Sequence, residues 1–580
     1  MLRTHTCGEL RADHQDSEVT LCGWVHRRRD HGGLIFIDLR DRYGFTQVVF
    51  EPENKEQFAL AEKVRPEWVL KVNGKVRGRV DGAVRDDNPT GAVEVVVGEA
   101  TVLNESKTPP FEIDQDKDIG EEVRLEYRFL DLRRTRMQKN LKLRNDIVQV
   151  IREYFHRNDF LEVETPIMVK GTPEGSREYL VPSRLHHGSF YVLPQSPQQL
   201  KQLLMVAGVD KYFQVPRCFR DEDQRGDRQP EFTQFEIEMS FVEQEDVIAQ
   251  LEECFIELSE KIRPDKKIQA TPFPRMTYKE AMETYGSDKP DLRFELKFTD
   301  VSDIAKDCGF TVFSSAETVK AMNVPGGSSM SRKDIDNLTD LAQRHGAKGL
   351  AWVRVGEDSG PVVKNAGDAF LKSLNKKTGA KDGDIIFFAA GEYPHALEPL
   401  GEVRKAAAKM LDMIDTSIWS YVWILDFPMF EKSKETGAIG AVHHPFTRPH
   451  PEDEKLVESD PLAARALAYD LALDGNEVGG GSMRIHERDL QKKIFDILGI
   501  TEDDADRRFG HLLRAFEYGA PPHGGIAMGL DRVCMIFADE PNIREVIAFP
   551  KDQKAKDLML GSPSPMPQEQ LEELGIRVIE

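Results

Sequence analysis

Hydrophobic and polar residues alternate along the first hundred residues of the chain. The alternation predicts five short strands, with a helical pattern at 56–62 between the third and the fourth: 19–25, 34–39, 45–50, 69–76 and 92–97. Five strands with a helix after the third are typical of an OB barrel, a common holder of single-stranded nucleic acid. Other small β-barrels give similar patterns, so this signal alone leaves the type of barrel open.

The period of the pattern changes after the predicted barrel. Residues 105–140 contain a proline-rich and then an acidic polar run, which marks a linker. Helical spacing follows at 136–156, then an extended segment at 160–168, and β-like stretches with one helix near 198–207. Residues 286–415 differ, because loops rich in Lys, Asp and Gly interrupt short helices and strands. We therefore expect an α+β multidomain chain in which this block is an inserted α+β domain.

Composition narrows the class of protein. The chain has 580 residues, 40% of them hydrophobic, which suggests several domains with a substantial core. No apolar run is long enough to span a membrane, and the first residues lack the apolar core of a signal peptide, so we expect a cytoplasmic location. The six scattered cysteines predict free thiols rather than disulfides or a zinc site.

Charge is distributed unevenly. The net charge of −22 excludes a general polycation, although a local basic stripe can still contact phosphates. Two such stripes occur, at 26–29 and at 124–144. For the second stripe, phosphate contacts and an ordinary solvated helix face remain equal alternatives.

Two glycine-rich segments carry candidate chemistry. Residues 479–481 are three consecutive glycines, flanked by Glu477 and Arg484. A backbone without side chains suits close approach by a planar ligand. Asp531 and Arg532 follow a second glycine-rich segment, 523–529, which we interpret as a turn. Bare backbone beside arginine is suited to hold a nucleotide, and two ordinary glycine turns are the alternative.

Three short motifs resemble those of class II aminoacyl-tRNA synthetases. Arg220-x-Glu222 resembles motif 2, Pro166 with its preceding apolar segment resembles motif 1, and residues 529–532 (Gly-Leu-Asp-Arg) resemble motif 3. Their order and spacing match along nearly the whole chain. An N-terminal OB domain and a domain inserted between motifs 2 and 3 are similar to the aspartate-specific bacterial members. The resemblance implies an antiparallel-sheet catalytic domain and a homodimer.

The resemblance also implies a division of the chain. An OB-fold anticodon-binding domain would be followed by a linker, two catalytic parts separated by the inserted domain, and a C-terminal extension within the last part. The expected boundaries are 1–104, 105–140, 141–285, 286–415 and 416–580.

An ATP site follows from the resemblance. Arg220 would bridge the α-phosphate and the attacking carboxylate, because a planar guanidinium can bind two oxygens at once. Arg532 would hold the γ-phosphate, and Glu222 and Gln229 would lie near the adenine and ribose. The implied catalytic residues are Arg220, Glu222 and Arg532, and the implied ATP set is Arg220, Asp221, Glu222, Gln229, Glu477, Gly529, Leu530, Asp531 and Arg532.

A metal site is implied beside it. Asp470 and Glu477 resemble the carboxylates that hold phosphate-bound Mg²⁺ in this family. A small number of oxygen ligands suits a metal that keeps several waters. A surface carboxylate is the alternative interpretation of Asp470.

The amino-acid pocket must hold an ammonium and a side-chain carboxylate. Lys201 and Arg484 are the cations assigned to the carboxylate, and Glu174 resembles the loop residue that closes over the ammonium. A buried cation without a counter-charge is costly, so an amide substrate is disfavoured. His443 and His444 resemble a His-His pair beside the carboxylate. The expected aspartate set is Glu174, Gln198, Lys201, Arg220, His443 and Arg484.

The barrel would read the anticodon. Phe36 can stack on a base and Gln47 can hydrogen-bond a base edge, while Arg28 and its neighbours would hold phosphates. Glu94 resembles the residue that contacts the last anticodon base. Each of these residues has an alternative interpretation as ordinary barrel surface.

Two further positions bear on tRNA choice. His31, in an expected loop at 29–33, and Gly82 resemble the positions of family members that charge tRNA(Asn) as well as tRNA(Asp). These two residues favour the relaxed specificity, in which both tRNAs are charged.

The expected activity is an aspartate–tRNA ligase reaction that uses ATP and Mg²⁺. Its partners would be L-aspartate, tRNA(Asp) and, from His31, tRNA(Asn), with no membrane and no DNA. Three rivals remain. They are an asparaginyl- or lysyl-tRNA synthetase, a non-catalytic RNA-binding paralogue, and an ATP-dependent asparagine synthetase on the same catalytic fold.

Overall fold

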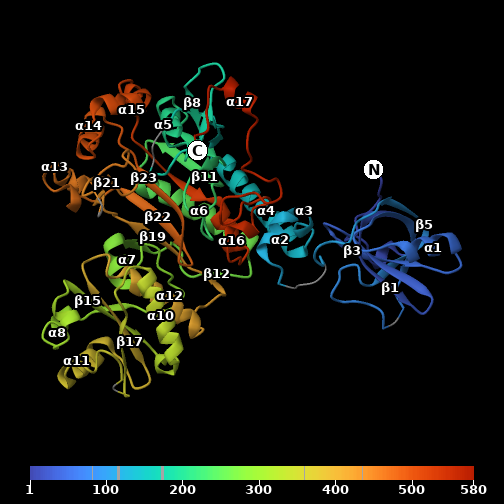
Figure 1. Cartoon of the computed structure of the whole chain (residues 1–580), viewed down its shortest axis with the longest axis horizontal. Coiled ribbons are helices and arrows are strands. Elements are labelled where there is room, and N and C mark those ends of the chain that lie inside the picture. Colours follow the sequence, from blue (N-terminus) through green and yellow to red (C-terminus); the bar gives the residue numbers. More distant parts are fainter. Residues whose placement is uncertain (81, 114–117, 172–174, 358, 434–435, 580) are drawn as a thin grey trace. The chain divides into compact units, whose positions relative to one another are not determined.

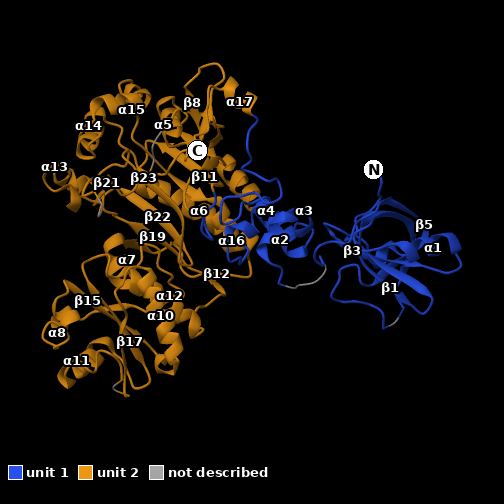
Figure 2. Ribbon diagram, in the orientation of Figure 1, with its two compact units in different colours: residues 1–145, 224–229, 538–567 blue, residues 146–223, 230–537, 568–580 orange. Residues whose placement is uncertain are grey.

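The computed structural model covers the whole chain and divides it into two compact units (Figure 2). It describes every residue except 81, 114–117, 172–174, 358, 434–435 and 580. Unit 1 comprises residues 1–145, 224–229 and 538–567, and unit 2 comprises 146–223, 230–537 and 568–580. Within the described residues, no helix has the length and apolar character needed to cross a membrane.

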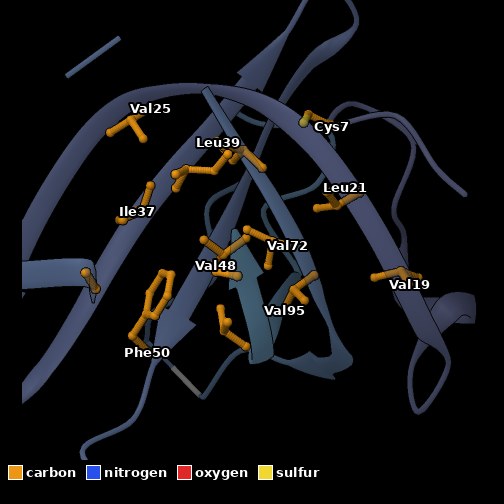
Figure 3. Close-up of a cluster of buried hydrophobic side chains, with 14 of the residues drawn as sticks. Cys7, Val19, Leu21, Val25, Ile37, Leu39, Val48, Phe50, Val72 and Val95 are labelled. Carbon is orange, nitrogen blue, oxygen red and sulfur yellow. The ribbon is translucent and has the colours of Figure 1, made fainter. Parts of the chain in front are cut away.

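A closed five-stranded barrel forms the first part of unit 1. Its strands pair in the order β1-β2-β3-β5-β4, and the predicted helix lies between β3 and β4. Apolar side chains from alternate strand positions fill its interior, among them Leu21, Ile37, Val48 and Val72 (Figure 3). The barrel prediction is confirmed, with these bounds: β1 Glu18–His31, β2 Leu34–Asp41, β3 Gly44–Phe50, α1 Lys55–Lys63, β4 Val69–Gly78 and β5 Val93–Asn104.

Strand β1 extends further than the sequence pattern indicates. Arg29 and His31, expected in a loop, pair with Phe36 and Leu34 of β2. The connection is only Gly32-Gly33, whose φ angles are 62° and 81°. Two central residues with positive φ suit the tight hairpin turns that match strand twist. The expected loop is therefore the end of a hairpin.

The second basic stripe lies mostly in a structural ion network of unit 1. It covers α2 (Glu121–Glu126), α3 (Arg128–Asp131) and the start of α4 (Thr135–Arg157). Arg128 is 2% exposed and donates to Asp131 at 2.6 Å, and Arg124 donates to Glu545 at 2.7 Å. These paired arginines fit neither of the interpretations offered by the sequence, because their charges are neutralised inside the unit.

Unit 2 is built on a nine-stranded sheet (Figure 1). Eight strands follow the order β13-β19-β22-β23-β24-β11-β9-β6, and β10 pairs with β11. The central pairs are antiparallel, whereas the pairs at both ends, β13–β19 and β6–β9, are parallel. The bounds are β6 Leu161–Glu162, β9 Lys211–Gln214, β10 Arg217–Phe219, β11 Glu231–Ser240, β13 Arg275–Thr277, β19 Tyr421–Leu425, β22 Ala468–Leu473, β23 Asn476–Met483 and β24 His523–Gly529.

Both glycine-rich segments lie in central strands, so the turn interpretation of 523–529 is wrong. A Cβ on Gly480 would lie 2.7 Å from Oδ1 of Asp470. A Cβ on Gly481 would lie 2.4 Å from the carbonyl oxygen of Gly525 on the neighbouring strand. Glycine is needed here because adjacent strands and side chains occupy the space of a side chain.

Helices cover the sheet of unit 2. They are α5 Gln198–Val206, α6 Gln244–Ile262, α7 Tyr278–Tyr285, α14 Arg488–Ile497, α15 Glu502–Phe516 and α16 Leu530–Phe537. Small two-stranded sheets join β7 (Leu180–Pro182) with β8 (Phe190–Val192), β12 (Lys267–Ile268) with β18 (Ile418–Trp419), and β20 (Phe430–Lys432) with β21 (Ile439–Ala441). The predicted helix near 198–207 is thus confirmed.

The expected inserted block contains its own antiparallel sheet. The strand order is β14-β15-β17-β16, with bounds Phe298–Asp300, Thr318–Val324, Ile385–Gly391 and Ala351–Arg354. Helices α10 (Arg332–Arg344) and α12 (Glu398–Met410) pack on one face, and α11 (Asp368–Thr378) packs on the other. Alternate residues of β15 and β17 therefore fill two separate cores.

All six cysteines are free thiols, as predicted.

Candidate active site

Four charged side chains meet in the interior of unit 2. Nζ of Lys201, on α5, lies 3.0 Å from Glu236 and 3.4 Å from Glu238, both on β11. Arg484, just after β23, donates from Nε and Nη2 to the two carboxylate oxygens of Glu238 at 2.9 and 3.1 Å. Lys201 is 1% exposed and Arg484 2%. The structure therefore brings the two predicted carboxylate-binding cations into one buried cluster.

The two glutamates were missed by the sequence analysis. Glu236 and Glu238 are two positions apart on β11, so they project from the same face of the strand. That spacing is a signal in the sequence, but carboxylates in a strand ordinarily face solvent. Here both are fully buried and each faces a cation.

Burial affects the two glutamates differently. Burial raises the pKa of Glu236 above its usual value, and Lys201 only partly offsets this rise. Burial also acts to raise the pKa of Glu238, but Arg484 and Lys201 lower that pKa below its usual value. Glu238 is consequently the firm counter-ion of Arg484. Glu236 retains the capacity to bind a further cationic donor.

The two histidines lie beside different partners. Nε2 of His443 lies 3.3 Å from Oδ1 of Asp470, and this carboxylate raises the pKa of His443 in spite of burial. Nε2 of His444 accepts a hydrogen bond from Nη1 of Arg484 at 2.8 Å. Burial and Arg484 lower the pKa of His444 well below its usual value. His444, which was not in the expected aspartate set, is thus the histidine in contact with Arg484.

The motif 2 residues follow strand β10. The guanidinium of Arg220 lies over the ring of Phe232 at 5.0 Å, and its backbone N–H donates to Pro230 at 2.9 Å. The side chain of Glu222 accepts a hydrogen bond from Oγ of Ser176. Stacking on Phe232 limits the directions in which the guanidinium of Arg220 can extend.

The loop before β7 contacts both motif 2 and the side chain of Gln195. Asp221 donates its N–H to the carbonyl of Arg177 at 3.1 Å. Ser176 donates its N–H to Oε1 of Gln195 at 3.0 Å. Glu174, the expected loop residue over the ammonium, lies outside the described residues.

Gln229 belongs to unit 1. There its side-chain amide exchanges two hydrogen bonds with the backbone of Lys551, accepting at 2.7 Å and donating at 3.0 Å. Its side chain is therefore held by its own unit.

The motif 3 residues divide between the interior and the partly exposed side of unit 2. Asp531 is 3% exposed and accepts the backbone N–H of Thr233 at 2.8 Å, and Leu530 is 1% exposed. Gly529 pairs with Gln234 of β11. Arg532 remains partly exposed and donates to the carbonyl of Glu477. Of the two charged residues in the motif, Arg532 is partly exposed, whereas Asp531 is buried.

Three carboxylates, those of Asp470, Glu477 and Asp288, interact electrostatically in unit 2. Burial raises the pKa of Asp470 on β22; His443 partly offsets this rise, and Glu477 and Asp288 add to it. Lys289 lies 3.0 Å from Asp288 and 3.9 Å from Glu477. No group of three or more His, Cys, Asp or Glu side chains with metal-binding geometry occurs in the part of the chain that the structure describes. These carboxylates are few and repel one another. Such a set fits Mg²⁺, because this ion is usually bound through one or two carboxylates and keeps several waters.

A polar network joins strands of the barrel in unit 1, and its Asp38, Gln47 and Glu94 are buried. Arg29 donates to Asp38 at 2.9 Å and to Oε1 of Gln47 at 3.1 Å. Nε2 of Gln47 donates to Glu94 at 2.7 Å, and Glu94 also accepts from Arg77 at 2.7 Å. Gln47 and Glu94, two of the expected anticodon residues, are thus held together from β3 and β5.

The other expected tRNA residues are placed nearby or at loop tips. Phe36 is half-buried and lies opposite Arg29 in the strand register. Arg28 donates from Nε to the carbonyl of Ala61 at 2.9 Å. His31 is exposed at the hairpin end. Gly82 has a φ of 82°, and a Cβ there would meet no atom within 4 Å.

Comparison with protein families defines the class. Residues 120–553 match the family described as tRNA synthetases class II (D, K and N), and residues 19–103 match the OB-fold nucleic acid binding domain. The chain belongs to the class II tRNA synthetases of this group, as the three motifs suggested.

Individual proteins resemble the chain over its length. A protein of Rubrobacter xylanophilus named aspartate–tRNA(Asp/Asn) ligase is 52% identical, over 99% of this chain and 96% of its own. A protein of the same name from Oleidesulfovibrio alaskensis is 51% identical, over 100% and 96%. The structure of Pyrococcus horikoshii asparaginyl-tRNA synthetase with asparaginyl-adenylate has a TM-score of 0.60 at 19% identity, covering 95% and 98%. That structural likeness shows the shared fold.

Proposed function

We propose that this chain is an aspartate–tRNA ligase that charges both tRNA(Asp) and tRNA(Asn). It activates L-aspartate with ATP to aspartyl-AMP and pyrophosphate, and then transfers the aspartyl group to the 3′ end of tRNA. The buried cluster of Lys201, Arg484, Glu236 and Glu238 carries this proposal. The shared name of the two relatives supports it.

The cluster matches the charges of aspartate. Arg484 and Lys201 place two buried positive charges in the cluster and together are suited to attract the side-chain carboxylate, because hydrogen bonds between charged groups are the stronger kind. Glu236, whose raised pKa reflects incomplete compensation, is suited to the α-ammonium, with Gln198 and the loop residue Glu174 as further acceptors. Asparagine would offer no negative side-chain charge to Lys201 and Arg484, and lysine would bring a further cation beside them, which disfavours both rivals.

The reacting groups belong to the motif residues. Arg220 would bind the α-phosphate and the attacking carboxylate together, and Arg532 would hold the γ-phosphate. Glu222 and Asp221 would contact the nucleoside, whereas Gly529, Leu530 and Asp531 would place Arg532. In-line displacement of pyrophosphate is promoted mainly by positioning and by neutralising charge. In the transfer step, the adenylate phosphate is suited to take the proton of the attacking tRNA hydroxyl.

Asp470 and Glu477 would hold Mg²⁺. The ion supplies neutralisation of the ATP phosphates when it is bound. His443 would keep Asp470 in place through their 3.3 Å contact.

The barrel would read the anticodon. Gln47 and Glu94 would hydrogen-bond bases, Phe36 would stack, and Arg28 would contact the backbone. The exposed His31 and the open Gly82 would tolerate either third anticodon base. The proposed domains are 1–104 (anticodon binding), 105–140 (linker), 141–285 and 416–580 (catalytic), and 286–415 (inserted).

The chain is further proposed to act in the cytoplasm as a homodimer through the motif 1 segment. Leu161, Ile167 and Met168 of that segment are about half exposed, at 56%, 47% and 57%. Exposed apolar side chains grouped in one segment suit a subunit contact.

ATP–pyrophosphate exchange tests the proposal. Exchange that depends on aspartate, and not on asparagine or lysine, is expected. Exchange with either other amino acid would redirect the assignment to that synthetase, and absence of exchange would favour the non-catalytic paralogue. Ammonia-dependent formation of asparagine without tRNA would favour the asparagine synthetase.

A further inference from the structure

His523, at the start of β24, is a buried histidine with a defined pattern of hydrogen bonds. It is 0% exposed, and Nδ1 lies 2.8 Å from the carbonyl oxygen of Pro521. A carbonyl only accepts, so Nδ1 carries a proton. Burial lowers the pKa of His523, which keeps the ring neutral and leaves Nε2 as an acceptor. His523 is thus held in one tautomer.

Gln202 continues the pattern. Its Nε2 donates to Nε2 of His523 at 3.2 Å, and its Oε1 accepts from Nε2 of Gln198 at 3.2 Å. Gln198 and Gln202 lie four residues apart on α5, so their side chains share one face of the helix. Both side chains are buried, at 5% and 0% exposure. If the amide of Gln202 were flipped, its oxygen would face the acceptor Nε2 of His523, and its NH₂ group would face the NH₂ group of Gln198.

We infer that His523 is a positioning residue, which fixes the amide of Gln198 through Gln202 so that the carbonyl oxygen Oε1 of Gln198 is offered to the α-ammonium of the amino-acid substrate. The inference rests on the proposed function, in which Gln198 is an acceptor for aspartate. With its NH₂ group committed to Gln202, Gln198 presents an acceptor to a donor. The opposite orientation would present an NH₂ group to an ammonium, which is repulsive.

Burial is the main reason why the pKa of His523 is lowered, and the charges around the ring act in both directions. Glu238 on β11 faces it and favours protonation, whereas Arg484 and His486, both after β23, oppose protonation. Arg484 forms its bidentate contact with Glu238, so much of that carboxylate's charge is compensated. A neutral His523 is required, because a protonated ring would donate from Nε2 and would reverse the amide of Gln202.

Two substitutions separate positioning from bulk structure. His523→Asn retains a donor near Nδ1 for Pro521 but cannot reach Gln202. His523→Gln is long enough to offer a carbonyl oxygen to Gln202. In the full-length protein, we expect H523N to raise KM for aspartate about tenfold, the size of one lost hydrogen bond to a charged ligand. KM for ATP and kcat should stay within about twofold, and H523Q should restore KM for aspartate to within about threefold.

A double-mutant cycle with Gln202→Met tests the route of the effect. If His523 acts through Gln202, H523N adds no further increase to KM for aspartate in the Q202M background. If the increases in KM for aspartate of the two single variants multiply in the double variant, the inference is overturned. His511→Asn, on α15, is the matched control and should change neither constant.

Three further outcomes would overturn the inference, and one of them would also overturn the proposed function. Equal rises in KM for aspartate and ATP, with equal losses of Tm in H523N and H523Q, would identify His523 as merely structural and would overturn the inference. Unchanged constants in H523N, with normal wild-type exchange, would overturn it and leave the proposed function intact. Absence of aspartate-dependent exchange in the wild type would overturn both.

Discussion

Nη1 of Arg484 donates a hydrogen bond to Nε2 of His444 at 2.8 Å, while two other nitrogens of the same guanidinium hold Glu238. The guanidinium is therefore oriented on two sides before any ligand binds. A preformed, buried arginine loses little entropy when it binds a carboxylate. This arrangement makes Arg484 the most direct residue through which to test the amino-acid pocket.

Arg484→Lys should lower aspartate-dependent kcat/KM in pyrophosphate exchange about 100-fold. Lysine keeps the charge but loses the planar fork, and charge-assisted hydrogen bonds of this kind contribute about 1.5–3 kcal/mol each. ATP binding, measured by calorimetry, should persist. Arg488→Lys at an exposed ion pair with Glu517 is the matched control. Unchanged exchange in R484K would contradict the pocket assignment.

Arg484→Lys is a sharper variant than Arg484→Ala. Removing the guanidinium would leave Lys201 as the one cation in contact with two buried carboxylates, Glu236 and Glu238, and breaking a buried ion pair typically costs about 3–5 kcal/mol of stability. Loss of activity in the alanine variant would then mix unfolding with loss of binding.

The stability of unit 2 should fall in acid partly through His444. Its folded pKa lies well below the value of about 6.5 in an unfolded chain, so below that pH the unfolded state binds a proton that the folded state does not. Stability then declines by up to about 1.4 kcal/mol per pH unit until the folded pKa is reached. His444→Gln, measured by Tm from pH 7.5 to 5.5, should show a smaller decline than the wild type. An equal decline would contradict this origin.

Gly480→Ala should weaken the use of Mg²⁺. The added Cβ would lie 2.7 Å from Oδ1 of Asp470, too close unless the carboxylate moves. We expect a several-fold rise in the Mg²⁺ concentration that half-saturates pyrophosphate exchange, which Asp470→Asn should reproduce. Glu487→Gln, an exposed carboxylate, should leave the Mg²⁺ dependence unchanged.

Glu94→Gln should separate tRNA recognition from activation. The substitution weakens the charge that Arg77 contacts and alters the acceptor of Gln47. We expect kcat/KM for tRNA in aspartylation to fall about tenfold, while exchange without tRNA stays the same. Glu99→Gln, exposed on the same strand, is the control. An equal fall in exchange would place the effect outside the anticodon site.

The sequence predicted the barrel well because five alternating strands with a helix after the third are compatible with few topologies. The resemblance to the class II synthetases assigned Lys201 and Arg484 to one site, and the structure brings both into contact with Glu238. The barrel follows from a local pattern that the chain displays directly, whereas the assignment of the two cations depends on the resemblance.

The missed features depend on contacts between distant segments. Glu236 and Glu238 face cations from α5 and β23, so their burial is invisible in the local pattern of β11. The glycines of 523–529 are typical of a turn in isolation, but neighbouring strands take the space of their side chains. Arg124 likewise becomes structural through Glu545, far away along the chain.

His31→Leu should reduce charging of tRNA(Asn) more than charging of tRNA(Asp). His31 is exposed at the end of the β1–β2 hairpin, where its replacement leaves the barrel core unchanged. Side-by-side kcat/KM values for the two tRNAs measure this preference. Equal losses for both tRNAs would show that His31 does not discriminate between them.

Aspartylation of purified tRNA(Asp) and tRNA(Asn), with ATP, Mg²⁺ and labelled aspartate, tests the central claim most directly. The account predicts that the wild-type protein charges both tRNAs. Charging of tRNA(Asp) alone would contradict the relaxed specificity, and charging of neither would contradict the ligase itself.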